Sequence, residues 1–342
     1  MCTAAVFGDK NRFFGRNLDL EVGFGESVIV MPRGFGLSFE FMPDLKHHAA
    51  MIGTGIVEDG YPLYFEATNE YGLSMAGLNF VGNCYYENTA LDMCDNVCQF
   101  ELIPHILGRC AKVEEARRLI ARINLVGEPF SPSLPLPQLH WMIADGEECI
   151  VLEITREGTR VFDDPFGVLT NNPPFDFHLN NINNYAKLSV NDPEAFFGEG
   201  LTFSRYSRGM GAIGLPGDWS SASRFVRAAF VRANARVENE DNSDGEISGG
   251  ALQLFHILSS VAMPYGCVAV EDKYEYTRYT SCCDVMTGDY YFKRYYDAFI
   301  SQVKMRDFDL DAVSLYSIPH GDCMPIAEKQ EKHAGIRQKI NY

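Results

Sequence analysis

The 342-residue sequence has few positive charges: 29 lysines and arginines stand against 46 aspartates and glutamates, which gives a net charge of -17. A charge of this sign repels the phosphate backbone of nucleic acids and the anionic surface of a membrane. We therefore expect neither as a partner. The same charge slows the capture of a small anionic substrate, so an enzyme for such a substrate needs arginines placed close to its site.

The sequence also lacks a long apolar run. The longest candidate, residues 252–263, is interrupted by four polar side chains and is too short to cross a bilayer. The first twenty residues carry five charged side chains, which does not fit a secretory signal or an anchor. We expect a soluble cytoplasmic protein.

Metal-ligand patterns are lacking as well, although ten cysteines are present. Without an export signal, a reducing compartment is expected, where most cysteines are small buried hydrophobic residues. Cys94 and Cys98 have no second pair of Cys or His at a metal-binding spacing, and the eight histidines are scattered. We predict no metal and no cofactor.

Two hairpins are predicted near the N-terminus. Residues 2–7 and 12–20 flank the turn 8–11, and residues 61–68 and 73–80 flank the turn 69–72. The first hairpin places Cys2 opposite residues 16–18, so Arg16 and Asp19 come close to the terminus through local pairing alone.

The remaining pattern indicates antiparallel sheets with helices in pairs between them. Since strands do not alternate with single helices, we expect an α+β protein rather than parallel βαβ units. There is no repeat and no break in composition, which predicts one domain over residues 1–342, with a polar surface loop at 238–246 and a tail or oligomer arm at about 325–342. Further strands are expected at 27–31, 49–53, 139–145, 149–154, 159–162 and 167–170, and helices at 97–110, 113–123, 221–235 and 252–263.

Cys2 is the first residue with chemical potential. It is small enough for Met1 to be removed, which would leave a thiol and a free α-amine on one residue. The thiolate is the reactive form of cysteine, and a guanidinium such as that of Arg16 favours it. An α-amine, with a reference pKa of about 7.7 to 8.0, suits a proton acceptor, and Asp19 could orient the ammonium. The alternative is that Cys2 is an accident of composition and that Arg16 and Asp19 are solvated strand ends.

Several segments together carry a family resemblance. They read MCT, FGRNLD, NEYGLSMAGLNF, LHWMIAD, VLTNNPPFDFH, GLPGD, SRFVR, LFHILSSVAMP and YTSCCD. In this order the chain resembles the choloylglycine hydrolase family, the N-terminal nucleophile amidases that include bile salt hydrolases and penicillin V acylases. The resemblance implies an αββα sandwich of two antiparallel sheets between helical layers, an exposed Cys2 as mature N-terminus, and a homotetramer.

The resemblance also assigns the catalytic residues. Arg16 and Asp19 match the pair in GRNLD, and the others are Asn79 in GLNF, Asn171 in LTN and Arg224 in SRF. The Asn171 amide and the Asn79 backbone N–H are suited to hold a tetrahedral oxyanion, while Arg16 and Arg224 supply positive charge. His140 is expected in the core, because the terminal amine makes a histidine base unnecessary.

The implied reaction is amide cleavage through a Cys2 thioester, with transacylation when an amine replaces water. Asn79 occupies a position where Gram-positive penicillin acylases tend to carry tyrosine, so the resemblance favours a bile salt hydrolase acting on glycine or taurine conjugates of bile acids. A penicillin V acylase or another N-acyl amidase is the alternative. A non-catalytic binding protein on the same scaffold is disfavoured, because all matched catalytic positions are filled.

The resemblance further suggests substrate contacts. A sterol needs an apolar cleft, for which the candidates are Leu18, Phe24, Phe65, Phe130 and Leu134, with residues 127–138 as a preformed loop at its mouth. Ordinary packing is the alternative for each. Ser207 and Arg208 stand where relatives that prefer glycine conjugates often read Gly-x-Gly, which points toward taurine conjugates; the alternative for Arg208 is a solvated loop arginine.

Overall fold

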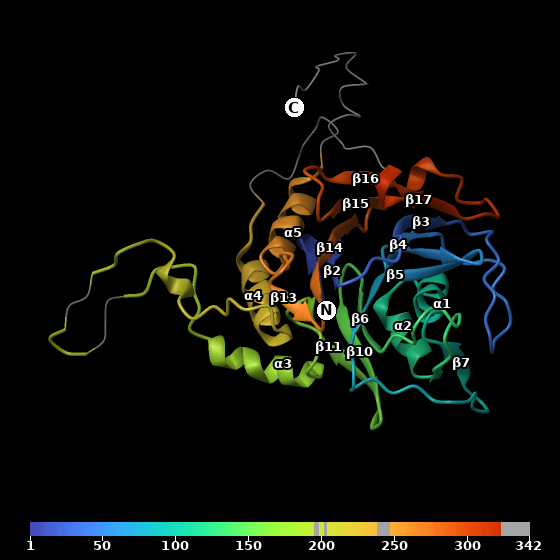
Figure 1. Ribbon diagram of the computed structural model, residues 1–342, viewed down its shortest axis with the longest axis horizontal. Coiled ribbons are helices and arrows are strands. Elements are labelled where there is room, and N and C mark those ends of the chain that lie inside the picture. Colours follow the sequence, from blue (N-terminus) through green and yellow to red (C-terminus); the bar gives the residue numbers. More distant parts are fainter. Residues whose placement is uncertain (195–197, 202–203, 238–246, 323–342) are drawn as a thin grey trace, which may run out of the picture.

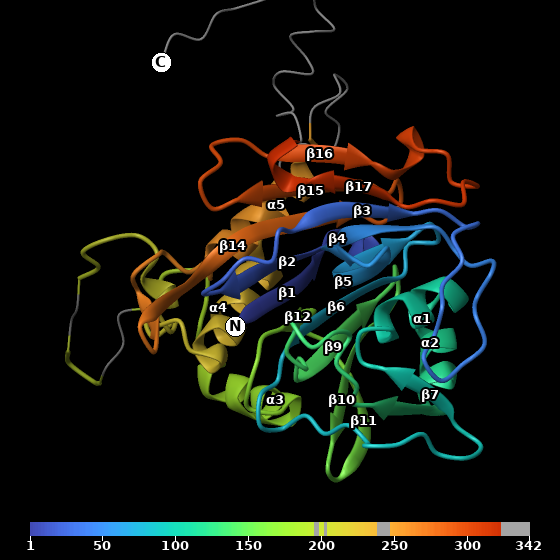
Figure 2. The same ribbon diagram turned by 45° about the vertical axis from the view of Figure 1, so that its right-hand side comes forward.

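The computed structural model describes residues 1–194, 198–201, 204–237 and 247–322. Two antiparallel sheets lie face to face, with α3, α4 and α5 outside one sheet and α1 and α2 outside the other (Figures 1 and 2). The predicted αββα sandwich is confirmed. The predicted surface loop at 238–246 and the tail at about 325–342 lie outside the described residues.

The first sheet contains the N-terminal hairpin at its centre. Its strand order is β12-β1-β2-β14-β15-β16, and β13 also pairs with β14. The bounds are β12 (Val168–Leu169), β1 (Cys2–Phe7), β2 (Phe13–Leu20), β14 (Lys273–Asp284), β15 (Asp289–Arg294), β16 (Ser301–Lys304) and β13 (Val268–Val270). The neighbours of β1 and β2 thus come from distant parts of the chain.

The second sheet has eight strands in the order β11-β10-β9-β6-β5-β4-β3-β17. Their bounds are β11 (Gly158–Asp163), β10 (Cys149–Thr155), β9 (Leu139–Ala144), β6 (Ser74–Asn79), β5 (Tyr61–Asn69), β4 (Met51–Glu58), β3 (Ser27–Met31) and β17 (Tyr316–Pro319). A short parallel pair, β7 (Asp95–Cys98) and β8 (Ile123–Val126), flanks α1 and α2.

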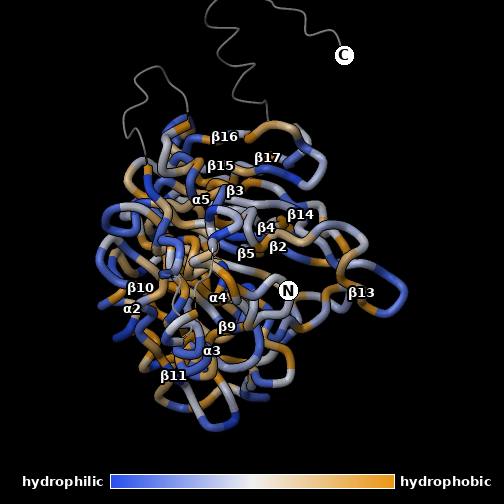
Figure 3. Tube along the Cα trace, turned by 90° about the vertical axis from the view of Figure 1, so that its left-hand side faces the viewer, coloured by the Kyte–Doolittle hydropathy of each residue, from blue (hydrophilic) through white to orange (hydrophobic). Residues whose placement is uncertain are grey.

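The helices bury apolar faces against the sheets. Their bounds are α1 (Leu102–Arg109), α2 (Val113–Ile120), α3 (Phe175–Asn181), α4 (Ser221–Asn234) and α5 (Gly249–Ser259). The hydroxyl of Ser220 caps α4 and that of Ser248 caps α5, each accepting a backbone N–H three residues on. Hydrophilic residues gather in loops such as the one beyond β13 (Figure 3). Within the described residues no helix is long and apolar enough to cross a membrane.

Both predicted hairpins are confirmed. In the first, Cys2 pairs with Leu18 and Ala4 pairs with Arg16, as the position of the turn required. The second hairpin forms from β5 and β6. The predicted helices at 113–123 and 221–235 correspond to α2 and α4, with α2 ending three residues earlier.

The helix predicted over residues 97–110 is wrong in its first turn. Val97 and Cys98 belong to β7 and pair with Leu125 and Val126 of β8. The Glu101 carboxylate then accepts the Cys98 N–H, and α1 begins only at Leu102. Pairing with a distant strand therefore overrides the local helical spacing.

Other differences concern the C-terminal part. The helix predicted at 252–263 begins earlier, at Gly249, because Ser248 provides its N-cap, and it ends at Ser259. Strands β14 and β15 were not predicted from the sequence, although tyrosine and threonine are frequent in β14. Strand β14 pairs with β2, so the strand that was not predicted is a direct neighbour of the N-terminal hairpin.

The contact between β2 and β14 leaves no room for a side chain at Gly15, and this allows a stability prediction. A Cβ at Gly15 would lie 2.1 Å from the Ser281 carbonyl oxygen. We expect Gly15→Ala to lower the free energy of unfolding by about 2 kcal/mol, because the strands must separate. Gly36→Ala is the control, since a Cβ there meets nothing within 4 Å. Thermal unfolding of both variants checks this, and equal melting temperatures would contradict it.

Candidate active site

Cys2 is the first residue of β1 and is buried, with 2% of its surface exposed. In the chain that still carries Met1, side chains from β2 and α4 surround Cys2, and its exposure as the mature N-terminus stays a prediction. Arg16 Nη2 donates a hydrogen bond to Cys2 Sγ at 2.6 Å. This contact sets a positive charge against the sulfur.

Arg16 is itself held rigidly. Its Nη1 donates to the carbonyl oxygens of Phe65 at 3.0 Å and Gly77 at 2.8 Å, which belong to the facing sheet. The same nitrogen lies 3.7 Å from a carboxylate oxygen of Glu66. Burial lowers the pKa of Arg16, but the negative groups around it, Cys2 first, raise the pKa above its ordinary value. The guanidinium therefore stays charged.

Asn171 and Arg224 hold the backbone of Cys2 from the other side. Asn171 Oδ1 accepts the Cys2 N–H at 2.8 Å and an Arg224 Nη2–H at 2.7 Å. Arg224 Nη1 also donates to the Cys2 carbonyl and to Thr3 Oγ1. Burial lowers the pKa of Arg224, and Asp19 and Cys2 oppose this effect.

The Asn171 carboxamide connects this group to Asn79. Asn171 Nδ2 donates to the Asn79 carbonyl oxygen at 2.8 Å. A carboxamide has two N–H donors, so one remains for an oxyanion. The structure thus brings Asn79 and Asn171 together beside Cys2, and their expected role in an oxyanion hole stays a prediction.

Asp19 lies at the end of β2, close to the N-terminus. Its Oδ1 accepts a hydrogen bond from Thr277 Oγ1 at 2.6 Å, while Oδ2 is buried without a hydrogen-bond partner in the described part of the chain. Burial raises the pKa of Asp19, and Arg224 and the terminal ammonium oppose the rise. The Met1 ammonium donates to the Asp19 backbone oxygen at 2.8 Å and contacts the carboxylate of Glu275. Burial lowers the pKa of this amine.

His140 lies in the core, as expected. It stacks on Phe80, its Nδ1 lies 3.2 Å from Glu153 Oε1, and its Nε2 lies 3.0 Å from the Thr170 carbonyl oxygen. None of these contacts involves Cys2, and the contact with Thr170 supports the segment before Asn171 instead. No group of His, Cys, Asp or Glu within the described ranges is arranged to hold a metal ion.

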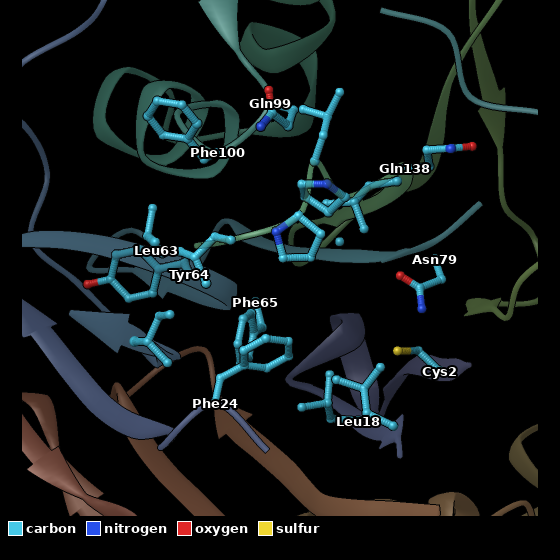
Figure 4. Close-up of a pocket in the computed structure, with 18 of the residues that line it drawn as sticks. Cys2, Leu18, Phe24, Leu63, Tyr64, Phe65, Asn79, Gln99, Phe100 and Gln138 are labelled. Carbon is cyan, nitrogen blue, oxygen red and sulfur yellow. The ribbon is translucent and has the colours of Figure 1, made fainter. Parts of the chain in front are cut away.

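An apolar cavity of about 360 Å³ opens beside Cys2. Figure 4 shows the Cys2 sulfur at one end of the cavity, near Asn79. Leu18, Phe24 and Phe65 follow along the cavity, and Phe100 lies at the far end. All five apolar residues singled out from the sequence line it: Leu18, Phe24, Phe65, Phe130 and Leu134. Residues 134–139, which include two prolines and two leucines of the loop, form part of its wall.

Ser207 and Arg208 are placed elsewhere. Both are exposed, and neither lines the cavity. They belong to the segment between α3 and α4, whose described residues extend away from the helical layer (Figure 1). The expected contact of Ser207 and Arg208 with a substrate therefore stays a prediction. Within one chain, neither residue lines the cavity.

Three residues of the site were missed from the sequence. Glu66, Thr277 and Glu275 are buried and contact Arg16, Asp19 and the N-terminal ammonium, respectively. Two of them lie on β14, which was not predicted. Glu66 could have been identified from the sequence, because it is an acidic residue inside an apolar strand. Such a residue is rarely buried without a partner.

The chain is similar to several known proteins over most of its length. Residues 2–318 match the family of linear amide C–N hydrolases described as the choloylglycine hydrolase family. A bile salt hydrolase/transferase of Lactiplantibacillus plantarum is 45% identical over 320 residues, which cover 93% of this chain and 97% of that protein. A bile salt hydrolase/transferase of Clostridium perfringens is 36% identical, with 95% and 99% of the two chains covered.

Solved structures show the same architecture. A mutant of the conjugated bile acid hydrolase from Clostridium perfringens superposes with a TM-score of 0.84 at 35% identity, covering 93% of this chain and 96% of that one. A penicillin V acylase from Agrobacterium tumefaciens gives 0.70 at 18% identity, covering 95% and 97%, which shows a shared fold.

The position of Cys2 predicts the effect of replacing its sulfur. We expect Cys2→Ser to lower kcat for a linear amide substrate on the order of a thousandfold while the fold is kept, because an alcohol is far harder to ionise than a thiol. Cys94→Ser, at an exposed cysteine, is the control. Steady-state kinetics with circular dichroism on both variants checks this, and a near-native rate for Cys2→Ser would place the nucleophile elsewhere.

Proposed function

The chain belongs to the choloylglycine hydrolase family of linear amide hydrolases, and we propose that it cleaves the amide bond of glycine- or taurine-conjugated bile acids through a thioester on Cys2. The observation that carries this proposal is the sulfur of Cys2, held by Arg16 at 2.6 Å at the end of an apolar cavity. A conjugated bile acid has the matching parts, a reactive amide next to a large apolar body.

The proposed reaction has two acyl transfers. After removal of Met1, the Cys2 thiolate attacks the amide carbonyl carbon, a C–S bond forms, and the oxygen becomes an oxyanion near Asn79 and Asn171. The C–N bond then breaks, and the leaving amine takes a proton from the Cys2 α-ammonium. Water then attacks the thioester carbonyl carbon and gives a proton to the α-amine. A C–O bond forms, the C–S bond breaks, and the bile acid leaves with the Cys2 thiolate restored. An amine in place of water gives transacylation.

Asp19 is suited to orient the α-amine in this cycle. The nitrogen of Cys2 already lies 2.8 Å from Asn171 Oδ1, so its position is fixed before Met1 leaves. The buried Asp19 Oδ2 has no hydrogen-bond partner in the described chain, and an ammonium on Cys2 would provide a positive charge nearby.

The cavity supports a steroid as the acyl part. Its lining is mainly apolar, and burial of apolar surface contributes about 25 cal/mol per Å². Covering roughly 200 Å² of a steroid would then contribute about 5 kcal/mol. Arg16 and Asn79 lie at the end of the cavity that holds Cys2, and they restrict the polar part of the substrate to that end.

Penicillin V acylase activity is the second candidate, because the penicillin V acylase from Agrobacterium tumefaciens shares the fold. The deciding experiment is a substrate panel of glycine conjugates, taurine conjugates and penicillin V with the purified protein. We expect kcat/KM to be highest for the bile acid conjugates. Hydrolysis of penicillin V alone would overturn the proposal, and absence of any fast-alkylating thiol at the N-terminus would indicate a non-catalytic protein.

We also propose that the protein is a cytoplasmic homotetramer. The segment between α3 and α4 carries exposed apolar residues, among them Val190, Tyr206 and Ile213. Such side chains on a projecting segment are typical of a contact with another subunit. Sedimentation of the purified protein tests the assembly, and a monomer at micromolar concentration would contradict it.

Removal of Met1 is a requirement of the proposed mechanism. Because Cys2 can supply a free α-amine only after this step, we expect active protein to have the mass of the chain without one methionine. Intact-mass spectrometry of the active fraction checks this. Full activity in protein that retains Met1 would exclude the α-amine as the base.

Arg208 provides a test of amine preference. A sulfonate has three acceptor oxygens and stays ionised, so a guanidinium can make charge-assisted hydrogen bonds to it. We expect Arg208→Ala to lower kcat/KM for taurine conjugates about tenfold more than for glycine conjugates, or about 1.4 kcal/mol. Since Arg208 does not line the cavity of its own chain, this effect requires the segment of a second copy.

Arg205→Ala, in the same exposed segment, is the matched control for Arg208→Ala. Equal losses on both conjugates would leave Arg208 as a general attractor of anions, and no loss on either would remove it from the site.

A further inference from the structure

Glu66 is a carboxylate buried between the two sheets. It lies on β5 of the second sheet, and 2% of its surface is exposed. Three hydroxyls of the first sheet donate to it: Tyr279 at 2.8 Å, Ser281 at 3.0 Å and Tyr290 at 2.6 Å. Three donors on two oxygens fit an ionised carboxylate, which only accepts hydrogen bonds.

The same carboxylate contacts the arginine that touches the nucleophile. Glu66 Oε2 lies 3.7 Å from Arg16 Nη1, and Arg16 Nη2 donates to Cys2 Sγ. A short path of charged groups therefore runs from the sulfur through the guanidinium to the carboxylate. The two carbonyl oxygens that Arg16 also binds, those of Phe65 and Gly77, carry no net charge.

We propose that Glu66 is a positioning residue for the reaction, which holds Arg16 and limits the positive charge that Arg16 exerts on the sulfur of Cys2. This inference rests on the proposed role of Cys2 as nucleophile. Glu66 acts through Arg16 and does not line the cavity, so it is not expected to contact substrate.

The charge of Glu66 has two opposite consequences for the sulfur. Without the carboxylate, Arg16 would favour the thiolate more strongly, so the thiolate would form at lower pH. That thiolate would also be less nucleophilic, because the nucleophilicity of a thiolate falls as its basicity falls, with a Brønsted coefficient of about 0.4 to 0.5. By this account Glu66 keeps the thiolate of Cys2 more nucleophilic, while a smaller fraction of the thiol is ionised at a given pH.

Other ionisable groups face this site and remain in every variant. Burial lowers the pKa of Arg224 on α4 and that of the Met1 ammonium, which precedes β1. Burial raises the pKa of Glu66, while Arg16 and the three hydroxyls oppose the rise. The groups around Glu66 and Cys2 are Arg16 and Asp19 on β2, Glu21 after β2, Glu275, Tyr279 and Cys283 on β14, Tyr290 on β15, Arg224 on α4, and His320, which reaches Tyr290 through Thr54.

The test is the pH dependence of iodoacetamide alkylation of Cys2 in protein without Met1, followed by peptide mass spectrometry. We expect Glu66→Gln to move the midpoint of the alkylation rate to lower pH by about one unit. The plateau rate should fall about threefold, as the Brønsted coefficient requires for that shift. A role in packing alone would not lower the midpoint and the plateau together.

Two variants separate charge from packing. Glu66→Asp keeps the charge with a shorter side chain, so its midpoint should return toward that of the parent protein. Glu101→Gln removes another buried carboxylate, which accepts the backbone N–H groups of Cys98 and Glu40, and should leave the alkylation profile unchanged. If Glu66→Gln does not fold, Ser281→Ala, which removes one donor to the carboxylate, should give a smaller shift in the same direction.

Alkylation needs no substrate, so the result is separate from the identity of the amide that is cleaved. A profile of Glu66→Gln that superposes on that of the parent would overturn the proposal, and so would a midpoint that moves to higher pH. If the parent protein does not hydrolyse bile acid conjugates in the substrate panel, but Glu66→Gln shifts the alkylation profile as expected, the proposed function alone is overturned.

Discussion

The hydrogen bond from Arg16 to the sulfur of Cys2 is the interaction on which the site depends. It requires a guanidinium with 1% of its surface exposed, and a buried charge is costly unless it is paired and hydrogen-bonded. The N-terminal hairpin places Arg16 near Cys2, but the carbonyl oxygens of Phe65 and Gly77 and the carboxylate of Glu66 come from the second sheet. The sandwich is thus closed around this arginine, and the site exists only where both sheets meet.

The nucleophile is fixed at its backbone as well as at its sulfur. Asn171, at the end of β12, and Arg224, on α4, bind the amide and the carbonyl of Cys2. Each of these residues also binds the other, so a displacement of one disturbs both. This arrangement restricts the first residue of a strand, a position that is otherwise prone to fray, to one geometry.

The apolar cavity shares Cys2, Arg16 and Asn79 with the polar cluster and extends from them into other parts of the fold. Its walls come from the chain after β2, from β5 and from the loop before β9, and they include Phe24, Phe65 and Phe130. Two of these segments are loops, which can vary without disturbing the sheets. The reacting group is therefore held by strands, and the cavity is lined by strands and loops together.

Local pattern in the sequence was sufficient for the N-terminal hairpin, because turn residues fix the register of an antiparallel pair and place Cys2 opposite Leu18. The family resemblance, rather than local pattern, identified Arg16, Asp19, Asn79, Asn171 and Arg224, which the structure brings together, as well as five residues of the cavity. The partners of these residues were decided by tertiary structure alone. Glu66 meets Arg16 across the two sheets, and Thr277 meets Asp19 through the pairing of β2 with β14, at separations in sequence that no local period reports. The start of α1 was decided in the same way, since β7 forms only when β8 lies beside it.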